Sequence, residues 1–131
     1  MLDLLTDALA PLGGHGFLLD GFSRTLAQAE RGFARAVLAG HPANVVVNLV
    51  VSDDEARQRL AGRADAGRAD DADPEVIERR LQVFHAETEP LLKFYDLRGV
   101  LVSVDATGSP DEVSRTMIAA VSSALASGGS T

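Results

Sequence analysis

Residues 16–30 of the chain, GFLLDGFSRTLAQAE, pass from an apolar triplet through a polar turn into a helical pattern. The triplet at 17–19 predicts a short buried strand that ends at Asp20. Apolar residues then recur three and four positions apart over 24–39, the stripe of an amphipathic helix, and Gly40 marks its expected end. A strand that leads through a turn into a helix is the repeating unit of an α/β fold.

The same alternation continues further along the chain. Residues 44–51, NVVVNLVV, are rich in β-branched side chains and predict a central parallel strand covered on both faces. Ser52 and Glu55 match the capping-box pattern that starts a helix, which we expect to run from 52 to about 62. The small and charged residues that follow, 63–71, predict a loop or short lid.

The remaining elements are predicted on either side of that lid. Residues 73–95 give the longest helix, in which Pro90 is expected to cause a kink or an interruption. Residues 100–104 predict a third buried strand, 109–125 a last helix and 2–10 a first one. Strands that alternate with helices imply a mostly parallel sheet with right-handed crossovers.

Length and composition limit the class of protein. The 131 residues favour one domain over 1–131, and the 12 basic against 19 acidic residues give a net charge of -7. Such a charge argues against a nucleic-acid partner. No apolar run reaches membrane-spanning length, so no membrane partner is expected. Because the chain has no cysteine, a disulfide scaffold is excluded and a cytoplasmic location is expected.

Asp20 is the first candidate for chemistry. Ligands of open parallel sheets bind beyond the carboxyl ends of the strands, where Asp20 is expected to lie. A carboxylate there could hold Mg²⁺ through water, although a turn or capping role fits the position equally well. The three histidines lack the spacing of metal ligands, and Ser23 lacks the sequence context of a hydrolase nucleophile.

Six of the 11 arginines surround the predicted lid. Guanidinium groups match phosphate oxygens, so this group suits closure over a polyphosphate. The same stretch is rich in Asp and Glu, and a solvated, salt-bridged face is the alternative. The six are Arg57, Arg59, Arg63, Arg68, Arg79 and Arg80.

The phosphate-binding loop of many phosphoryl-transfer domains is missing from the sequence. That loop, G-x-x-x-x-G-K-[ST], needs a lysine, and Lys93 is flanked by Leu92 and Phe94. The glycines at 13–16 precede the predicted strand at 17–19 rather than a helix, so they are not expected to replace the loop.

Residues 16–30 resemble the adenylate kinase segment GFLLDGFPRT, which is followed by a glutamine. The resemblance continues over 45–63, 68–95 and 104–113 and so covers nearly the whole chain, with a short lid at about 63–73. It implies a three-layer, P-loop-kinase-like parallel sheet with flanking helices. The first, central strand and the first helix of that fold would be lacking.

The resemblance implies phosphoryl transfer between ATP and AMP with Mg²⁺, in which positioning and charge stabilisation supply the catalysis. By position, Asp20 matches the aspartate that holds magnesium through water. The other matches are Gly21, Arg24, Gln28 and Arg80 for AMP, Arg59, Arg63 and Ala106 for ATP, and Arg24, Arg63 and Arg80 for catalysis, with Arg68 less well aligned.

Departures from the family pattern limit these expectations. Ser23 replaces a proline, and Ala106 replaces a glycine near the ATP base. Without the phosphate loop, little or no turnover is expected from the chain alone. The alternatives are a non-catalytic truncated or degenerate kinase, one half of a split kinase completed by a separate N-terminal segment, and a nucleotide-binding regulator.

Overall fold

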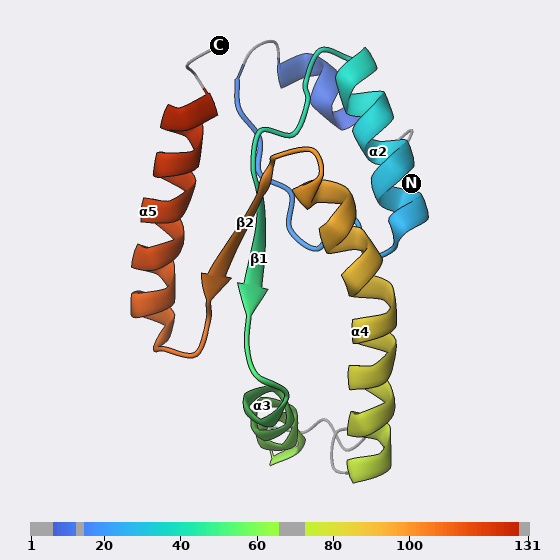
Figure 1. The fold of residues 1–131 in the computed structure, drawn as a ribbon, viewed down its shortest axis with the longest axis vertical. Coiled ribbons are helices and arrows are strands. Elements are labelled where there is room, and N and C mark those ends of the chain that lie inside the picture. Colours follow the sequence, from blue (N-terminus) through green and yellow to red (C-terminus); the bar gives the residue numbers. More distant parts are fainter. Residues whose placement is uncertain (1–6, 13–14, 66–72, 129–131) are drawn as a thin grey trace.

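The computed structural model describes residues 7–12, 15–65 and 73–128, which form alternating helices and strands (Figure 1). Residues 7–9 are helical. The elements that follow are η1 (Ala10–Leu12), α2 (Leu26–Leu38), β1 (Val46–Val50), α3 (Asp53–Asp65), α4 (Pro74–Asp96), β2 (Leu101–Asp105) and α5 (Pro110–Gly128). This order confirms the predicted α/β class.

β1 and β2 form a parallel sheet, with Val46 opposite Leu101 and Val50 opposite Asp105. The chain crosses from one strand to the other through α3 and α4, as parallel pairing requires. The strands lie between α5 on one side and α2 and α4 on the other (Figure 1). Both strands therefore end at the same edge of the sheet, on the side where α3 begins.

The buried strand predicted at 17–19 is wrong. These residues form no strand, and Leu18 is 94% exposed. Within the described residues the sheet has two strands, β1 and β2, rather than three. A strand needs a neighbour that accepts and donates its ladder hydrogen bonds, and the segment at 17–19 does not pair with β1.

The expectation that β1 would be covered on both faces is also wrong. Its first three residues are partly buried, whereas Leu49 and Val50 are about half exposed. The β-branched run does form a strand, because β2 supplies the ladder along one edge. Coverage depends on elements on both faces and both edges, which the described part of the chain does not supply.

α2 begins and ends close to the predicted residues. Thr25 is the N-cap, and its hydroxyl accepts a hydrogen bond from the Gln28 amide at 3.3 Å. This satisfies one of the free amides of the first turn. Beyond the helix, Gly40 has a φ of 76°, a left-handed conformation that suits glycine and turns the chain toward β1.

Of the two effects expected from Pro90, a kink or an interruption, the interruption does not occur, because α4 continues through this residue. Asp73 caps the helix by accepting from the Glu75 amide at 2.9 Å, and Pro74 occupies its first turn, as predicted. The proline removes one helical hydrogen bond. Packing of the buried residues that follow it, Leu91 and Tyr95 among them, holds this last part of the helix in place.

The core lies between α2 and α4 and the start of the sheet. It consists of Ala29, Leu91, Phe94 and Tyr95, and partly buried apolar residues of α2, of both strands and of the chain just before β2 surround it. The Phe94 ring packs edge-on against Phe33, with centroids 5.9 Å apart. This cluster fixes α2 against α4.

α3 starts at the predicted capping residue Ser52, and α5 starts at the predicted position with a capping box of its own. Ser52 accepts from the Glu55 amide at 3.2 Å. At α5, Ser109 and Glu112 each accept a hydrogen bond from the amide of the other. α3 extends to Asp65, so the loop predicted from residue 63 begins later.

The rest of the predicted lid, with Arg68, lies outside the described residues.

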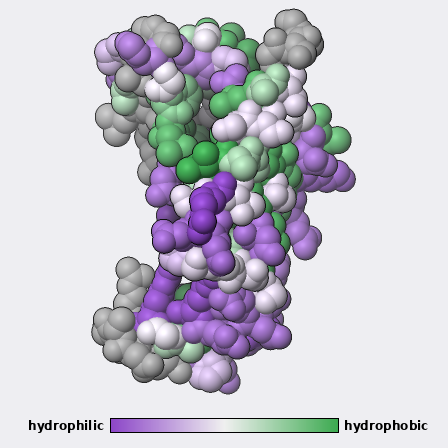
Figure 2. All heavy atoms as spheres, turned by 90° about the vertical axis from the view of Figure 1, so that its left-hand side faces the viewer, coloured by the Kyte–Doolittle hydropathy of each residue, from purple (hydrophilic) through white to green (hydrophobic). Residues whose placement is uncertain are grey.

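None of the described helices is both long enough and apolar enough to cross a lipid bilayer. Figure 2 views the molecule from the side on which α5 lies. Apolar side chains gather in the upper half of this face and polar side chains in its lower part.

A pair of substitutions in α4 tests where the core lies. Phe94→Ala should lower the free energy of unfolding by about 3 to 5 kcal/mol, because it empties a buried site. Phe84, on the same helix, is 55% exposed, and Phe84→Ala should cost less than about 1 kcal/mol. Urea unfolding of both variants measures the difference, and equal losses would contradict this assignment of the core.

Candidate functional site

The segment that carries Asp20, Gly21 and Arg24 is irregular and exposed and leads directly into α2. Gly21 has a φ of 70°, a conformation that residues with a Cβ rarely adopt. Its carbonyl accepts a hydrogen bond from Arg24 Nε at 3.4 Å. The turn therefore holds the arginine side chain near its own backbone, at the start of the helix.

Gln28 joins this group through the first turn of α2. Its side-chain Oε1 accepts a hydrogen bond from the Arg24 backbone amide at 2.9 Å. The side chains of Arg24 and Gln28 are both exposed and lie at the amino end of the helix. Free amides and the helix dipole favour negative charge at such an end, so the arrangement suits an anion.

Ser23, the residue that replaces the family's proline, makes a contact that was not predicted. It is buried, and its Oγ lies 2.7 Å from the Oη of Tyr95 in α4. The two residues are 72 positions apart, so no local pattern could have indicated the contact.

A second group lies at the carboxyl ends of the strands. Arg59 Nη2 donates to the Ala106 carbonyl at 2.7 Å, and Arg59 Nε donates to Glu55 at 2.9 Å. Ala106 is 5% exposed, and its amide donates to the Val50 carbonyl at the end of β1. The structure thus brings together two residues that the family resemblance assigned to one nucleotide.

Asp105, at the end of β2, is a carboxylate that was not predicted. Its Oδ1 accepts hydrogen bonds from the hydroxyl and the amide of Thr107, which hold the pKa of Asp105 below its ordinary value. These bonds stay within one turn, so we assign Asp105 a structural role in shaping the chain around Ala106.

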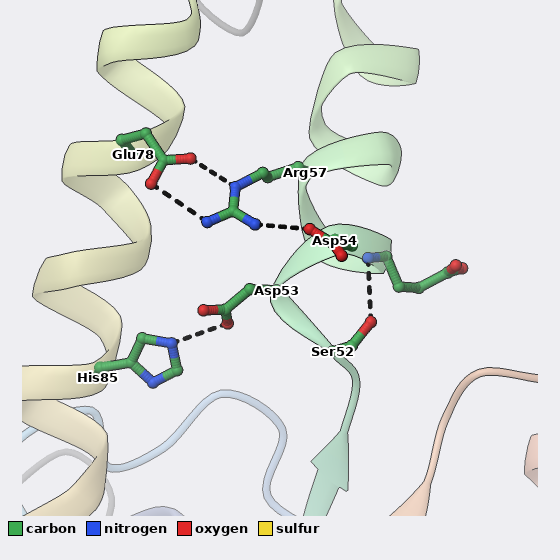
Figure 3. Close-up of polar contacts among 7 residues, drawn as sticks. Ser52, Asp53, Asp54, Arg57, Glu78 and His85 are labelled. Carbon is green, nitrogen blue, oxygen red and sulfur yellow. Dashed lines mark hydrogen bonds and ion pairs between the residues drawn. The ribbon is translucent and has the colours of Figure 1, made fainter.

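A polar network joins α3 to α4 (Figure 3). The Arg57 guanidinium lies between two carboxylates, with Nη1 2.8 Å from Asp54 and Nη2 3.3 Å from Glu78. A second contact joins His85 Nε2 to Asp53 Oδ1 at 2.8 Å. The hydrogen bonds from Arg57 lower the pKa of Glu78, and the same contact raises the pKa of Arg57.

The arginines around the predicted lid therefore do not all act alike. Arg57 and Arg59 are engaged in ion pairs, which favours the salt-bridged alternative for these two. Arg63 lies in the last turn of α3 and Arg80 in the second turn of α4, and both are exposed. Their exposure is compatible with contact to a ligand.

The acidic residues do not assemble into a metal centre in the described ranges. Over 7–12, 15–65 and 73–128 there is no group of three or more His, Cys, Asp and Glu side chains that could hold an ion. Asp20 is an exposed, single carboxylate. One carboxylate fits Mg²⁺ that keeps most of its waters and binds substrate phosphates.

The chain is similar to a known group of enzymes. The family model described as adenylate kinase matches residues 1–100. An adenylate kinase of Xylella fastidiosa strain 9a5c is 42% identical over 106 residues, which cover 81% of this chain and 57% of the relative. One from Micrococcus luteus is 45% identical over 117 residues, 88% of this chain and 57% of the relative. The chain thus spans less than three fifths of the length of these relatives.

The Glu78 contact gives a pH dependence whose direction is fixed. Because the pKa of Glu78 is lowered from 4.5 by Arg57, the ion pair stabilises the fold above pH 4.5, and this stability is lost as the pH falls through the native pKa. The difference in free energy of unfolding between the wild type and Glu78→Gln should therefore shrink from pH 7 to about pH 3.

Urea unfolding across this pH range measures the difference. Glu87→Gln, an exposed substitution on the same helix, is the control and should leave the pH profile unchanged. A loss in Glu78→Gln that is the same at every pH would contradict a role for the carboxylate charge.

Proposed function

This chain belongs to the adenylate kinase family, and from that membership we propose that it serves reversible phosphoryl transfer between ATP and AMP. The observation that carries the proposal is the joint position of Arg24 and Gln28 at the amino end of α2, linked by a hydrogen bond of 2.9 Å. This arrangement offers a phosphate and a purine base adjacent partners of the right chemistry.

The AMP half of the site is built on α2. Arg24 supplies a fork of donors for the AMP phosphate, and the amino end of the helix adds a favourable field. The Gln28 Oε1 is engaged by the backbone, so we propose that the amide Nε2 faces the acceptor atoms of adenine. Gly21 keeps the chain in the turn that precedes both residues, and Arg80 adds positive charge from α4.

The ATP half of the site is built on α3 and the strand ends. We propose that the guanidinium of Arg59 stacks near the ATP base, beside the chain at Ala106, while Arg63 contacts phosphate oxygens. Asp20 would hold Mg²⁺ through water, and the ion, when bound, neutralises charge on the transferred phosphoryl group. Arg24, Arg63 and Arg80 would stabilise the charge that spreads over the phosphates in the transition state.

The 131 residues hold no G-x-x-x-x-G-K-[ST] motif. Lys93 cannot replace its lysine, because it lies inside α4. We therefore propose that this chain alone transfers phosphoryl groups slowly or not at all. The same observation favours a second candidate, a nucleotide-binding chain without turnover, or one half of a split kinase.

A coupled ATP and AMP assay tests the proposal that this chain alone transfers phosphoryl groups slowly or not at all. The chain alone should turn over at least about a hundredfold more slowly than a complete adenylate kinase, because the backbone donors around the ATP phosphates are missing. The Micrococcus luteus relative is a suitable reference. Turnover within about tenfold of that enzyme would contradict the proposal.

AMP titration by calorimetry tests the second candidate function, nucleotide binding without turnover. The chain should bind AMP, and Arg24→Ala should weaken binding about tenfold or more, since hydrogen bonds between charged groups are lost. Arg31→Ala, an exposed arginine in the middle of the same helix, should keep the wild-type affinity. Equal effects of the two substitutions would mean that net charge, rather than the position of Arg24, determines binding.

A further inference from the structure

Ser23 and Tyr95 form a buried pair of hydroxyl groups next to Arg24. Ser23 is 9% and Tyr95 8% exposed, and the 2.7 Å between their oxygens is the ordinary length of an O–H···O hydrogen bond. A buried hydroxyl without a partner is costly because it has given up water. Each of the two oxygens therefore has a hydrogen-bond partner in the other.

The Tyr95 hydroxyl is a rigid anchor. Its ring lies in the core cluster with Ala29, Leu91 and Phe94 and packs edge-on against Phe94, with centroids 5.2 Å apart. A ring in a close-packed core cannot rotate away without leaving a void. The phenol oxygen therefore has a fixed position on α4.

Among the described residues, few other hydrogen bonds hold the segment that Ser23 anchors. Residues 15–24 form no strand, and no backbone hydrogen bond joins them to another described element. Phe17 touches the ring of His41, far from Arg24 in the segment. Close to Arg24, the polar contacts within the described chain are to Gly21 and Gln28, both local.

We propose that Ser23 and Tyr95 are positioning residues, whose buried hydrogen bond fixes the backbone from which Arg24 reaches the phosphate of a nucleoside monophosphate. Neither hydroxyl needs to touch the ligand. A guanidinium binds phosphate through two parallel hydrogen bonds, so small errors in its orientation lower affinity. The identity of the ligand in this inference rests on the proposed function, whereas the anchoring of the segment by Ser23 and Tyr95 does not.

Hydrogen exchange of the full chain, followed by mass spectrometry, tests the anchoring. Tyr95→Phe and Ser23→Ala should each speed exchange of the amides at 20–25 by at least about threefold. The double variant should exchange no faster than the more affected single variant, because both changes remove one bond. Ser127→Ala, which removes an exposed hydroxyl bonded within α5, is the matched control and should change nothing at 20–25.

AMP calorimetry tests whether the anchoring acts through Arg24. Tyr95→Phe should weaken AMP binding about threefold to tenfold, and this effect should vanish when the same substitution is made in Arg24→Ala. A purely structural loss would persist in both backgrounds. Circular dichroism melting confirms that each variant is folded at the temperature of the titration.

In the exchange experiment, two results would overturn the inference: unchanged exchange at 20–25, or exchange that rises evenly over α2, α4 and the segment. A Tyr95→Phe effect on AMP that persists in Arg24→Ala would also overturn it. If the wild-type chain fails to bind AMP, the proposed function fails, and the exchange experiment still decides whether Ser23 and Tyr95 hold the segment.

Discussion

The ladder between β1 and β2 is the interaction on which the rest of this structure depends. Parallel pairing brings the two strands to a common end, and the crossover through α3 and α4 places α4 beside the core. Within the described residues the sheet stops at these two strands. The chain at 17–19 has no backbone pairing with the other described elements, and among them side-chain contacts hold the segment that carries Asp20 and Arg24.

Features set by neighbouring residues could be predicted from the sequence. The capping boxes at Ser52 and Ser109 start α3 and α5, and the β-branched run over 44–51 forms β1. The strand at 17–19 could not be judged in this way, because an apolar triplet becomes a strand only beside a partner. The apolar composition of 17–19 predicted a buried strand, but whether these residues form a strand depends on a neighbouring strand that can pair with them.

In the candidate site, too, contacts between residues near in sequence could be predicted, and contacts between distant residues could not. Arg24 and Gln28 were found through a local motif, and one helical turn brings them together. Arg59 and Ala106 are 47 positions apart and Ser23 and Tyr95 are 72, so their contacts depend on how the helices pack and leave no local signal. The arginines near the lid illustrate a further limit, since composition could not show that Arg57 is held by two carboxylates.

The proposed site keeps the binding groups for a monophosphate, whereas the 131 residues hold no phosphate-loop motif for the triphosphate. The proposed anion site at the start of α2 needs only the helix end and its side chains, whereas a phosphate loop needs its own strand and helix. Calorimetric titration of the 131-residue chain with ATP and Mg²⁺ tests this claim most directly. We expect no saturable binding below about millimolar ATP; a micromolar dissociation constant would mean that these residues hold the triphosphate without a phosphate loop.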